Sequence, residues 1–258
     1  MRLDQQLLAR GLFSSRSLAQ DAIKEGRVQV NQKVVSKSAF DVNEEDVITL
    51  TQEELTFASR AGHKLYHAIK NFEINLNDKI VLDVGASTGG FSDVCLQQGA
   101  KLVYAVDVGS GQLIQHLLDN PKVINMENTN CRYLSSDLFP IKPQFVCMDV
   151  SFISILTILP SVISVLDDDF ELVLLIKPQF EAGKKDVGKN GLVKDMKVHQ
   201  RVINEILEAI TKMNLIPLHL QASTLKGRDG NQEYLLHCRN HGHPQIFHVR
   251  NIVMGRNE

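Results

Sequence analysis

Residues 1–58 carry the hydrophobic pattern of a small unit built from helices and a hairpin. Apolar residues recur at helical spacing twice before residue 24, which predicts two short helices. Residues 28–35 then alternate between apolar and polar side chains around Asn31 and Gln32, which predicts a hairpin. The tightest hairpin turns prefer Asn-Gly, so Gln32 predicts a longer or differently shaped turn.

Residues 59–258 show a different pattern, in which apolar strands alternate with helices. Strands are predicted at 79–84, 102–107, 145–149, 171–176, 216–222 and 233–238, and helices at 90–98, 111–118, 153–166 and 194–213. The strand at 171–176 is almost continuously apolar, which is typical of a sheet covered on both faces. The alternation predicts a doubly wound, Rossmann-like α/β domain that follows a small α+β domain. The tail 241–258 shows no clear period.

Charge is unevenly distributed, although the formal net charge is only −2. Residues 1–40 hold seven Lys or Arg against three acids, whereas residues 41–58 hold six acids and no Lys or Arg. The acidic segment predicts a turn and the start of a linker. A basic start is compatible with the binding of nucleic-acid phosphates, although a solvated helical face gives the same pattern.

Composition argues for a reduced, cytoplasmic protein without a metal site. The four cysteines form no C-x-x-C pair and lie among apolar neighbours, and the nine histidines form no cluster with metal-ligand spacing. The N-terminus lacks the apolar core of a signal peptide. The apolar stretch 153–166 contains Pro160 and is shorter than the roughly 20 residues of a membrane span, so it predicts a buried helix.

The strongest local motif is an apolar strand that ends in an acid and turns through glycines into a helix, Ile80-Val-Leu-Asp83-Val-Gly85-Ala-Ser87-Thr-Gly89-Gly90. The glycines allow the backbone to approach a ligand closely. The dinucleotide fingerprint would need glycine in place of Ser87, and no Walker lysine follows. Asp107 ends the next strand at the spacing of a β-α-β step, where an acid can accept hydrogen bonds from both hydroxyls of a ribose. A turn for another nucleotide is the alternative.

Four charged residues are candidates for a catalytic site in the predicted α/β domain: Lys64, Asp149, Lys177 and Glu233. Asp149 and Lys177 end two neighbouring strands, and ligands bind outside the carboxyl ends of such strands. A ribose hydroxyl is a poor nucleophile at neutral pH, but a lysine with a depressed pKa can accept its proton while carboxylates hold that lysine. Pro178 predicts a loop or kinked exit after Lys177. Each residue alone could serve a structural ion pair, but the four together predict a group-transfer site.

On these motifs the chain resembles the TlyA/hemolysin-A-like family, in which an S4 RNA-binding module precedes an FtsJ-type ribose 2′-O-methyltransferase. The N-terminal likeness rests on Arg2-Leu-Asp4, Ser15-Arg16 and Gly26-Arg-Val-Gln-Val-Asn31. The C-terminal likeness rests on the four charged residues and on the strings Asp149-Val-Ser-Phe and Lys177-Pro-Gln-Phe-Glu. Ala61-Gly62-His63 departs from the family's commoner Gly-Gly-x before the lysine.

The resemblance implies a class I methyltransferase fold and S-adenosyl-L-methionine-dependent 2′-O-methylation of ribosomal RNA at a cytidine, with ribosomal RNA or ribosomal subunits as the partner. It implies catalysis by Lys64, Asp149, Lys177 and Glu233. It implies cofactor binding by Asp83, Gly85, Ser87, Gly89, Gly90, Asp107 and Asn128. It implies RNA binding by Arg2, Arg16, Lys24, Arg27, Lys33 and Arg60.

Two other functions belong to different classes. A membrane-active hemolysin, which the family's older name invokes, is disfavoured by the absence of a spanning helix or a long series of alternating strands. A non-catalytic RNA-binding factor is disfavoured by intact candidates at all four catalytic positions. Two glycine-rich, basic segments, 182–191 and 226–231, could close over RNA or could be plain surface connections. The sequence leaves the oligomeric state open.

Overall fold

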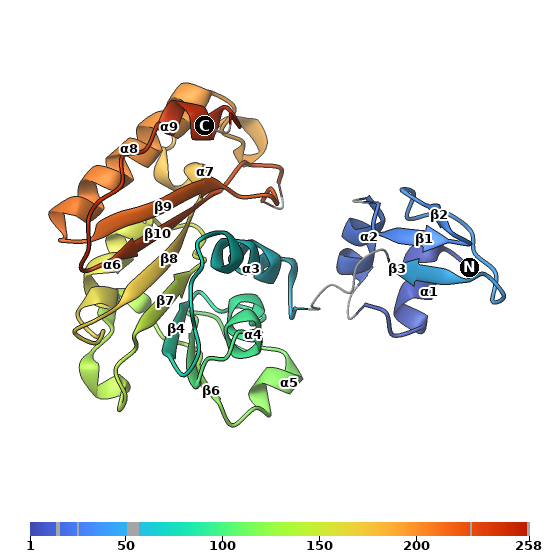
Figure 1. Cartoon of the computed structure of the whole chain (residues 1–258), viewed down its shortest axis with the longest axis horizontal. Coiled ribbons are helices and arrows are strands. Elements are labelled where there is room, and N and C mark those ends of the chain that lie inside the picture. The colour runs from blue at the N-terminus through green and yellow to red at the C-terminus, as the bar shows by residue number, and fades with distance from the viewer. Residues whose placement is uncertain (14–15, 25, 51–56, 228, 257–258) are drawn as a thin grey trace. The chain divides into compact units, whose positions relative to one another are not determined.

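The computed structural model describes residues 1–13, 16–24, 26–50, 57–227 and 229–256. Within this part the chain forms two compact units, Met1–Arg60 and Ala61–Glu258 (Figure 1). Residues 51–56 of the predicted acidic linker lie outside the described residues.

The first unit packs two helices against a small antiparallel sheet. The helices are α1 (Leu3–Ala9) and α2 (Arg16–Lys24), and the strands run in the order β2 (Lys33–Val34), β1 (Val28–Val30) and β3 (Ile48–Leu50). Most of the apolar positions that recur along this segment form its core, whereas Leu8 and Val34 are exposed. The core residues are Leu3, Leu7, Ala19, Ala22, Ile23, Val28, Val30, Val35 and Val42. The predicted helices and hairpin are therefore confirmed.

The hairpin turn differs from the prediction. Val30 lies opposite Lys33, so only Asn31 and Gln32 form the turn. Both residues adopt the left-handed conformation, with φ of 50° and 66°, as a type I′ turn requires. The Asn31 side chain donates to Asp46 Oδ1 at 2.8 Å and accepts from the Val47 backbone N–H at 2.9 Å. These two bonds hold the turn tight although Gln32 replaces the usual glycine.

The second unit is built on a mixed sheet of seven strands in the order β6-β5-β4-β7-β8-β10-β9. These strands are β4 (Ile80–Val84), β5 (Leu102–Val106), β6 (Val123–Met126), β7 (Phe145–Met148), β8 (Glu171–Ile176), β9 (Ile216–Ala222) and β10 (Tyr234–Arg239). Strands β4 to β8 run parallel to one another, and β10 runs antiparallel to both β8 and β9. This is the predicted Rossmann-like α/β fold, with one reversed strand near an edge.

Helices cover both faces of the sheet. They are α3 (Arg60–Asn71), α4 (Gly90–Gln97), α5 (Gln115–Leu118), α6 (Ile155–Ile163), α7 (Pro178–Glu181), α8 (Met196–Lys212) and α9 (Val249–Val253). Figure 1 shows α3 and α4 on one side of the sheet and α6 and α8 on the other. All six residues of β8 are buried, as its continuous apolar run predicted. No helix in the described part of the chain is long and apolar enough to cross a membrane.

Several elements differ from the predicted pattern. The helices α3 and α9 and the strand β6 were not predicted, and α5 begins only at Gln115 because residues 111–113 form a loop. The strand β6 lies at the sheet edge with two exposed positions, so it lacks an apolar run. The helix α7 begins directly at Pro178, contrary to the predicted loop, because proline is well suited to the first position of a helix.

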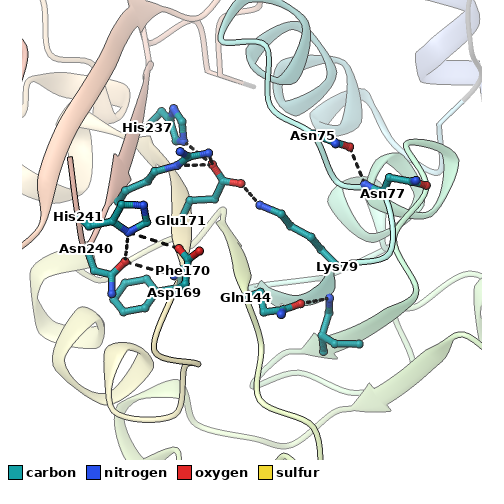
Figure 2. Close-up of polar contacts among 12 residues, drawn as sticks. Asn75, Asn77, Lys79, Gln144, Asp169, Phe170, Glu171, His237, Asn240 and His241 are labelled. Carbon is teal, nitrogen blue, oxygen red and sulfur yellow. Dashed lines mark hydrogen bonds and ion pairs between the residues drawn. The ribbon is translucent and has the colours of Figure 1, made fainter. Parts of the chain in front are cut away.

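At the amino-terminal edge of the sheet, a buried glutamate joins three strands (Figure 2). Glu171 is 1% exposed and forms ion pairs with Lys79 and with Arg239 at 2.8 Å, and its carboxylate is hydrogen-bonded to His237 Nε2 at 3.0 Å. Burial alone would raise the pKa of Glu171, but hydrogen bonds from His237 and Lys79 outweigh it and lower the pKa to about 2. The charged carboxylate therefore holds the start of β8 to residues flanking β4 and ending β10.

Replacing Glu171 with glutamine is expected to lower the free energy of unfolding by about 3 kcal/mol at pH 7, because Lys79 and Arg239 lose their buried counter-charge and His237 loses a carboxylate partner. In the wild type this stabilisation is complete above the ordinary glutamate pKa of 4.5 and is lost as pH falls toward about 2. Urea unfolding between pH 7 and pH 3 measures both effects. The exposed Glu208, which pairs with Lys212 on one helix, provides the control as Glu208→Gln and should change little. Equal acid sensitivity in wild type and Glu171→Gln would contradict the assignment.

Candidate active site

The glycine turn after β4 has the strained geometry that its sequence requires. Gly85 and Gly89 have φ of 86° and 93°, in the left-handed region. A Cβ atom at Gly85 would lie 2.5 Å from the backbone carbonyl oxygen of Asp149, so no side chain fits there. Ser87 also has positive φ, at 48°. Gly90 begins α4, which places the N-terminal end of that helix beside the turn.

Asp83, the last acid of β4, lies directly beneath this turn. Its carboxylate is fully buried and accepts a hydrogen bond from Ser92 Oγ at 2.6 Å. Burial, with a contribution from the nearby Asp149 charge, raises the pKa of Asp83 to about 7. The other oxygen, Oδ1, is buried without a hydrogen-bond partner among the residues that the structure describes. The turn therefore contains an unsatisfied acceptor, which a polar ligand could satisfy.

Asp107 ties the glycine turn to the neighbouring strand β5. Its two carboxylate oxygens accept the backbone N–H groups of Gly109 at 2.7 Å and Ser87 at 2.8 Å. Each oxygen keeps a second lone pair for a ligand hydroxyl. Asn128 is exposed just after β6, and its backbone N–H donates to Gly109 O at 3.0 Å. The structure thus brings Ser87, Asp107 and Asn128 together at the carboxyl-terminal edge of the sheet.

Sequence reasoning missed Glu127, which shapes the same region. Its carboxylate accepts the backbone N–H of Gln112 at 3.1 Å. Hydrogen bonds from Gly111 and Gln112 lower the pKa of Glu127. This contact helps to hold residues 111–113 as a loop beside the glycine turn. Glu127 and Asn128 directly follow β6, a strand that was not predicted, so Glu127 gave no separate signal.

The four candidate catalytic residues form two buried ion pairs. Lys177 Nζ lies 2.5 Å from Asp149 Oδ1, and Lys64 Nζ lies 2.5 Å from Glu233 Oε2. All four side chains are largely shielded from solvent, with exposed fractions between 3% and 16%. Buried ion pairs are costly to assemble, and they recur where chemistry needs a tuned charge.

The sheet register explains why the two pairs lie at one place. Asp149 directly follows β7 and Lys177 directly follows β8, and these strands are parallel neighbours. In the antiparallel pairing of β10 with β8, Tyr234 lies opposite Ile176, which brings the preceding Glu233 next to Lys177. Lys64 reaches Glu233 from α3.

Three further residues that sequence reasoning did not single out support the two pairs. Ser151 Oγ accepts a hydrogen bond from Lys177 Nζ at 3.0 Å. Gln179 Nε2 donates to Glu233 Oε1 at 3.5 Å, a long bond that links the segment after Lys177 to the other pair. A Cβ atom at Gly227 would lie 2.5 Å from Glu233 Oε1, so a side chain there would displace the carboxylate. Ser151 and Gln179 lie inside the two quoted strings, which was the available signal.

A large aromatic side chain projects from the loop that carries Asp149. Phe152 is 91% exposed and has φ of 64°, an uncommon conformation for a bulky residue. Its ring lies 5.0 Å from that of Phe180, and Lys177 Nζ lies 5.8 Å from the Phe180 ring centre. The apolar ring of Phe152 is thus exposed to solvent close to the candidate lysine. Its positive φ costs conformational energy.

The predicted RNA-binding residues occupy different settings. Arg2 and Arg16 both bind the fully buried Asp4, at 3.0 and 2.8 Å, and remain half exposed. The hydrogen bond from Arg2 is the main reason that the pKa of Asp4 lies well below its usual range. Lys24 and Lys33 are exposed on α2 and β2. Arg27 lies just before β1 and is partly buried. Arg60 is the first residue of α3, the helix that carries Lys64.

Comparison with known proteins agrees with this arrangement. Residues 57–240 match the family of FtsJ-like methyltransferases, and residues 1–48 match the S4 domain. The chain belongs to the FtsJ-like methyltransferase family. The TlyA/hemolysin-A-like resemblance and the fold class predicted from sequence are thereby confirmed.

Relatives of this FtsJ-like methyltransferase share both domains. The 16S/23S rRNA (cytidine-2′-O)-methyltransferase TlyA of Mycobacterium tuberculosis is 38% identical over 92% of this chain and 89% of its own length. Hemolysin A of Brachyspira hyodysenteriae is 40% identical over 92% of this chain and 99% of its own length. A solved structure from Streptococcus thermophilus, which carries a hemolysin label, has a TM-score of 0.76 and 36% identity over 99% of this chain and 94% of its own.

Proposed function

We propose that this FtsJ-like methyltransferase transfers a methyl group from S-adenosyl-L-methionine to a ribose 2′-hydroxyl of ribosomal RNA in the cytoplasm. The observation that carries the proposal is the pairing of Lys177 with Asp149 at 2.5 Å, at the sheet edge that also holds the glycine turn. Gly85 lies against the backbone of Asp149, so the glycine turn is in direct contact with the residue that pairs with Lys177. A donor held in the turn would therefore lie close to an amine that can accept a proton.

The residues around the turn fit S-adenosyl-L-methionine. Asp83 Oδ1 supplies an unsatisfied buried acceptor, and the exposed lone pairs of Asp107 can accept from ribose hydroxyls. The proposed binding set is the predicted one, namely Asp83, Gly85, Ser87, Gly89, Gly90, Asp107 and Asn128. When bound, the cofactor supplies an electrophilic methyl group on a sulfonium. The protein has to align the attacking oxygen and accept one proton.

The two ion pairs are proposed to have different roles in the reaction. In its deprotonated form, Lys177 accepts the proton of the ribose hydroxyl, and Asp149 stabilises the ammonium that results. Ser151 Oγ fixes the direction of the amine through its contact at 3.0 Å. Lys64 supplies a second positive charge that favours the developing alkoxide, and Glu233 holds Lys64 in place at 2.5 Å.

Residues of each unit are proposed to contact the RNA. The exposed ring of Phe152 offers a surface on which an unstacked base can lie close to Lys177. Arg2, Arg16, Lys24, Arg27, Lys33 and Arg60 are proposed to contact phosphates. Cytidine is the proposed target because the Mycobacterium tuberculosis relative carries cytidine-2′-O in its name.

The deciding experiment is methyl transfer from labelled S-adenosyl-L-methionine to unmodified ribosomal subunits. We expect label in RNA, at a linkage that resists alkali because the 2′-oxygen is blocked. Asp149→Ala is expected to lose nearly all labelling while S-adenosylhomocysteine still binds, because the change removes the partner of Lys177 and leaves the backbone of the turn. Absence of label from wild-type reactions, or alkali-sensitive label, would refute the proposal.

The hemolysin label of some relatives gives a second function to test. Leakage of a dye from liposomes by the purified protein would support membrane activity. We expect none at protein concentrations that saturate RNA labelling.

A further inference from the structure

The loop between α7 and α8 is fixed by polar side chains from other segments. This lysine loop, residues 183–195, is held by Asn231, which donates to Gly191 O at 2.9 Å and accepts from Val193 N–H at 3.0 Å. His199 Nε2 bonds Val193 O at 2.9 Å. Asn231 and His199 are 3% and 1% exposed. A connection with no role beyond joining two helices would not require two buried polar anchors.

The lysine loop also presents positive charge that the protein itself does not neutralise. Four exposed lysines lie on it: Lys184, Lys185, Lys189 and Lys194. Its two acids are otherwise engaged, since Asp186 pairs with Arg201 at 2.6 Å and Asp195 caps α8 through the Lys197 N–H at 2.8 Å. Among the described residues, none of the four lysines has an ion pair. The charge is therefore available to a partner.

Part of this charge lines a cavity. A space of about 340 Å³ is bounded by Asp186, Gly188, Lys189, Asn190, Leu192 and Lys194. On its wall, Asp186 pairs with Arg201, which also pairs with Glu205. The cationic side chains on the wall are Lys189 and Lys194, and neither has an ion pair among the described residues. Two ammonium groups around a concave surface attract a compact anion such as a phosphate.

The lysine loop is mechanically connected to the candidate active site. Asn231, which anchors the loop, precedes Glu233 by two residues, so their Cα atoms lie within about 7 Å of each other. The Gly227 backbone N–H also bonds Asn231 O at 2.8 Å, beside the Glu233 carboxylate. The position of the loop is therefore fixed relative to the Lys64–Glu233 pair.

We infer that the lysine loop binds backbone phosphates of the RNA next to the methylated nucleotide, with Lys189 and Lys194 around one phosphate. The inference rests on the proposed function, because it requires RNA at Lys177, and Asn231 fixes the loop close to Glu233 at the same site. Lysines bind phosphates as point charges, without sequence preference. The loop would hold the strand in register while other residues select the base.

The test measures binding of unmodified ribosomal subunits by the full chain across a range of salt concentrations. For Lys189→Ala/Lys194→Ala we expect about tenfold weaker binding, and a slope of log K against log salt that is shallower by about 0.7 to 0.9, because one phosphate contact is lost. The rate of methyl transfer at saturating RNA should stay within about twofold of wild type. Binding of S-adenosylhomocysteine should not change.

A matched control removes two lysine charges from a part of the domain that is distant from the lysine loop. Lys101 and Lys122 are exposed just before β5 and β6, at the opposite edge of the sheet, so Lys101→Ala/Lys122→Ala should keep the wild-type salt slope. Lys184→Ala/Lys185→Ala tests the same loop outside the cavity, and thermal unfolding identifies a misfolded variant. If wild type labels RNA but both loop variants keep its salt slope, the inference is wrong. If wild type labels no RNA, the proposed function itself fails.

Discussion

Replacing Lys177 with arginine is expected to lower the rate of methyl transfer by about 10²–10⁴-fold at saturating cofactor and RNA. Arginine keeps the positive charge and can still pair with Asp149, which lies 2.5 Å from Lys177 Nζ in the wild type. A guanidinium does not give up its proton in proteins, whereas an amine can. The substitution therefore removes the proposed proton acceptor and leaves the electrostatics of the site nearly intact.

Single-turnover labelling of RNA measures this loss. Binding of RNA and of S-adenosylhomocysteine should stay within a few-fold of wild type, which separates chemistry from assembly. Lys101→Arg, at an exposed lysine just before β5, is the control for the substitution itself. A Lys177→Arg rate above about a tenth of wild type would mean that Lys177 acts through its charge alone, and the proton would need another acceptor.

Replacing Gly85 with alanine is expected to weaken binding of S-adenosylhomocysteine by about tenfold to a hundredfold. The residue has φ of 86°, which costs any other residue type about 1–2 kcal/mol. The added Cβ would also lie 2.5 Å from the carbonyl oxygen of Asp149, so either the turn or the strand end must shift. Each 1.4 kcal/mol of lost complementarity is a factor of ten in affinity.

Calorimetry with the purified chain tests this expectation. Gly111→Ala is the matched control, because Gly111 has φ of 65° but open space around the position of a Cβ. It carries the same kind of backbone strain without the clash, so binding should change far less. Equal losses in the two variants would show that strain, and not the contact with Asp149, governs the turn.

The catalytic candidates could be predicted because each of three lies at a strand end. Asp149 follows β7, Lys177 follows β8 and Glu233 precedes β10, and apolar runs mark strands clearly. Lys64 was named as a candidate although α3, the helix that carries it, was not predicted. That helix contains Gly62 and has only a few apolar positions, and it is stabilised by burying Leu65, Ala68 and Ile69.

Other features depend on contacts that local patterns do not reveal. The partners of Glu171 are Lys79, His237 and Arg239. Each is more than 60 residues away from Glu171 in the sequence. The type I′ turn at Gln32 depends on the Asn31 side chain reaching Asp46 and Val47. Tertiary hydrogen bonds of this kind override the local preference from which the turn was predicted.

The pairing of Arg2 and Arg16 with Asp4 has a consequence for how this N-terminal unit can change during evolution. Both guanidiniums neutralise a carboxylate with no exposed surface, so losing either one would leave a buried charge short of partners. Selection for folding alone would therefore preserve basic residues at these two positions, even in a descendant that no longer met RNA. Lys24 and Lys33, which are exposed, are the positions at which relaxed selection would first become visible.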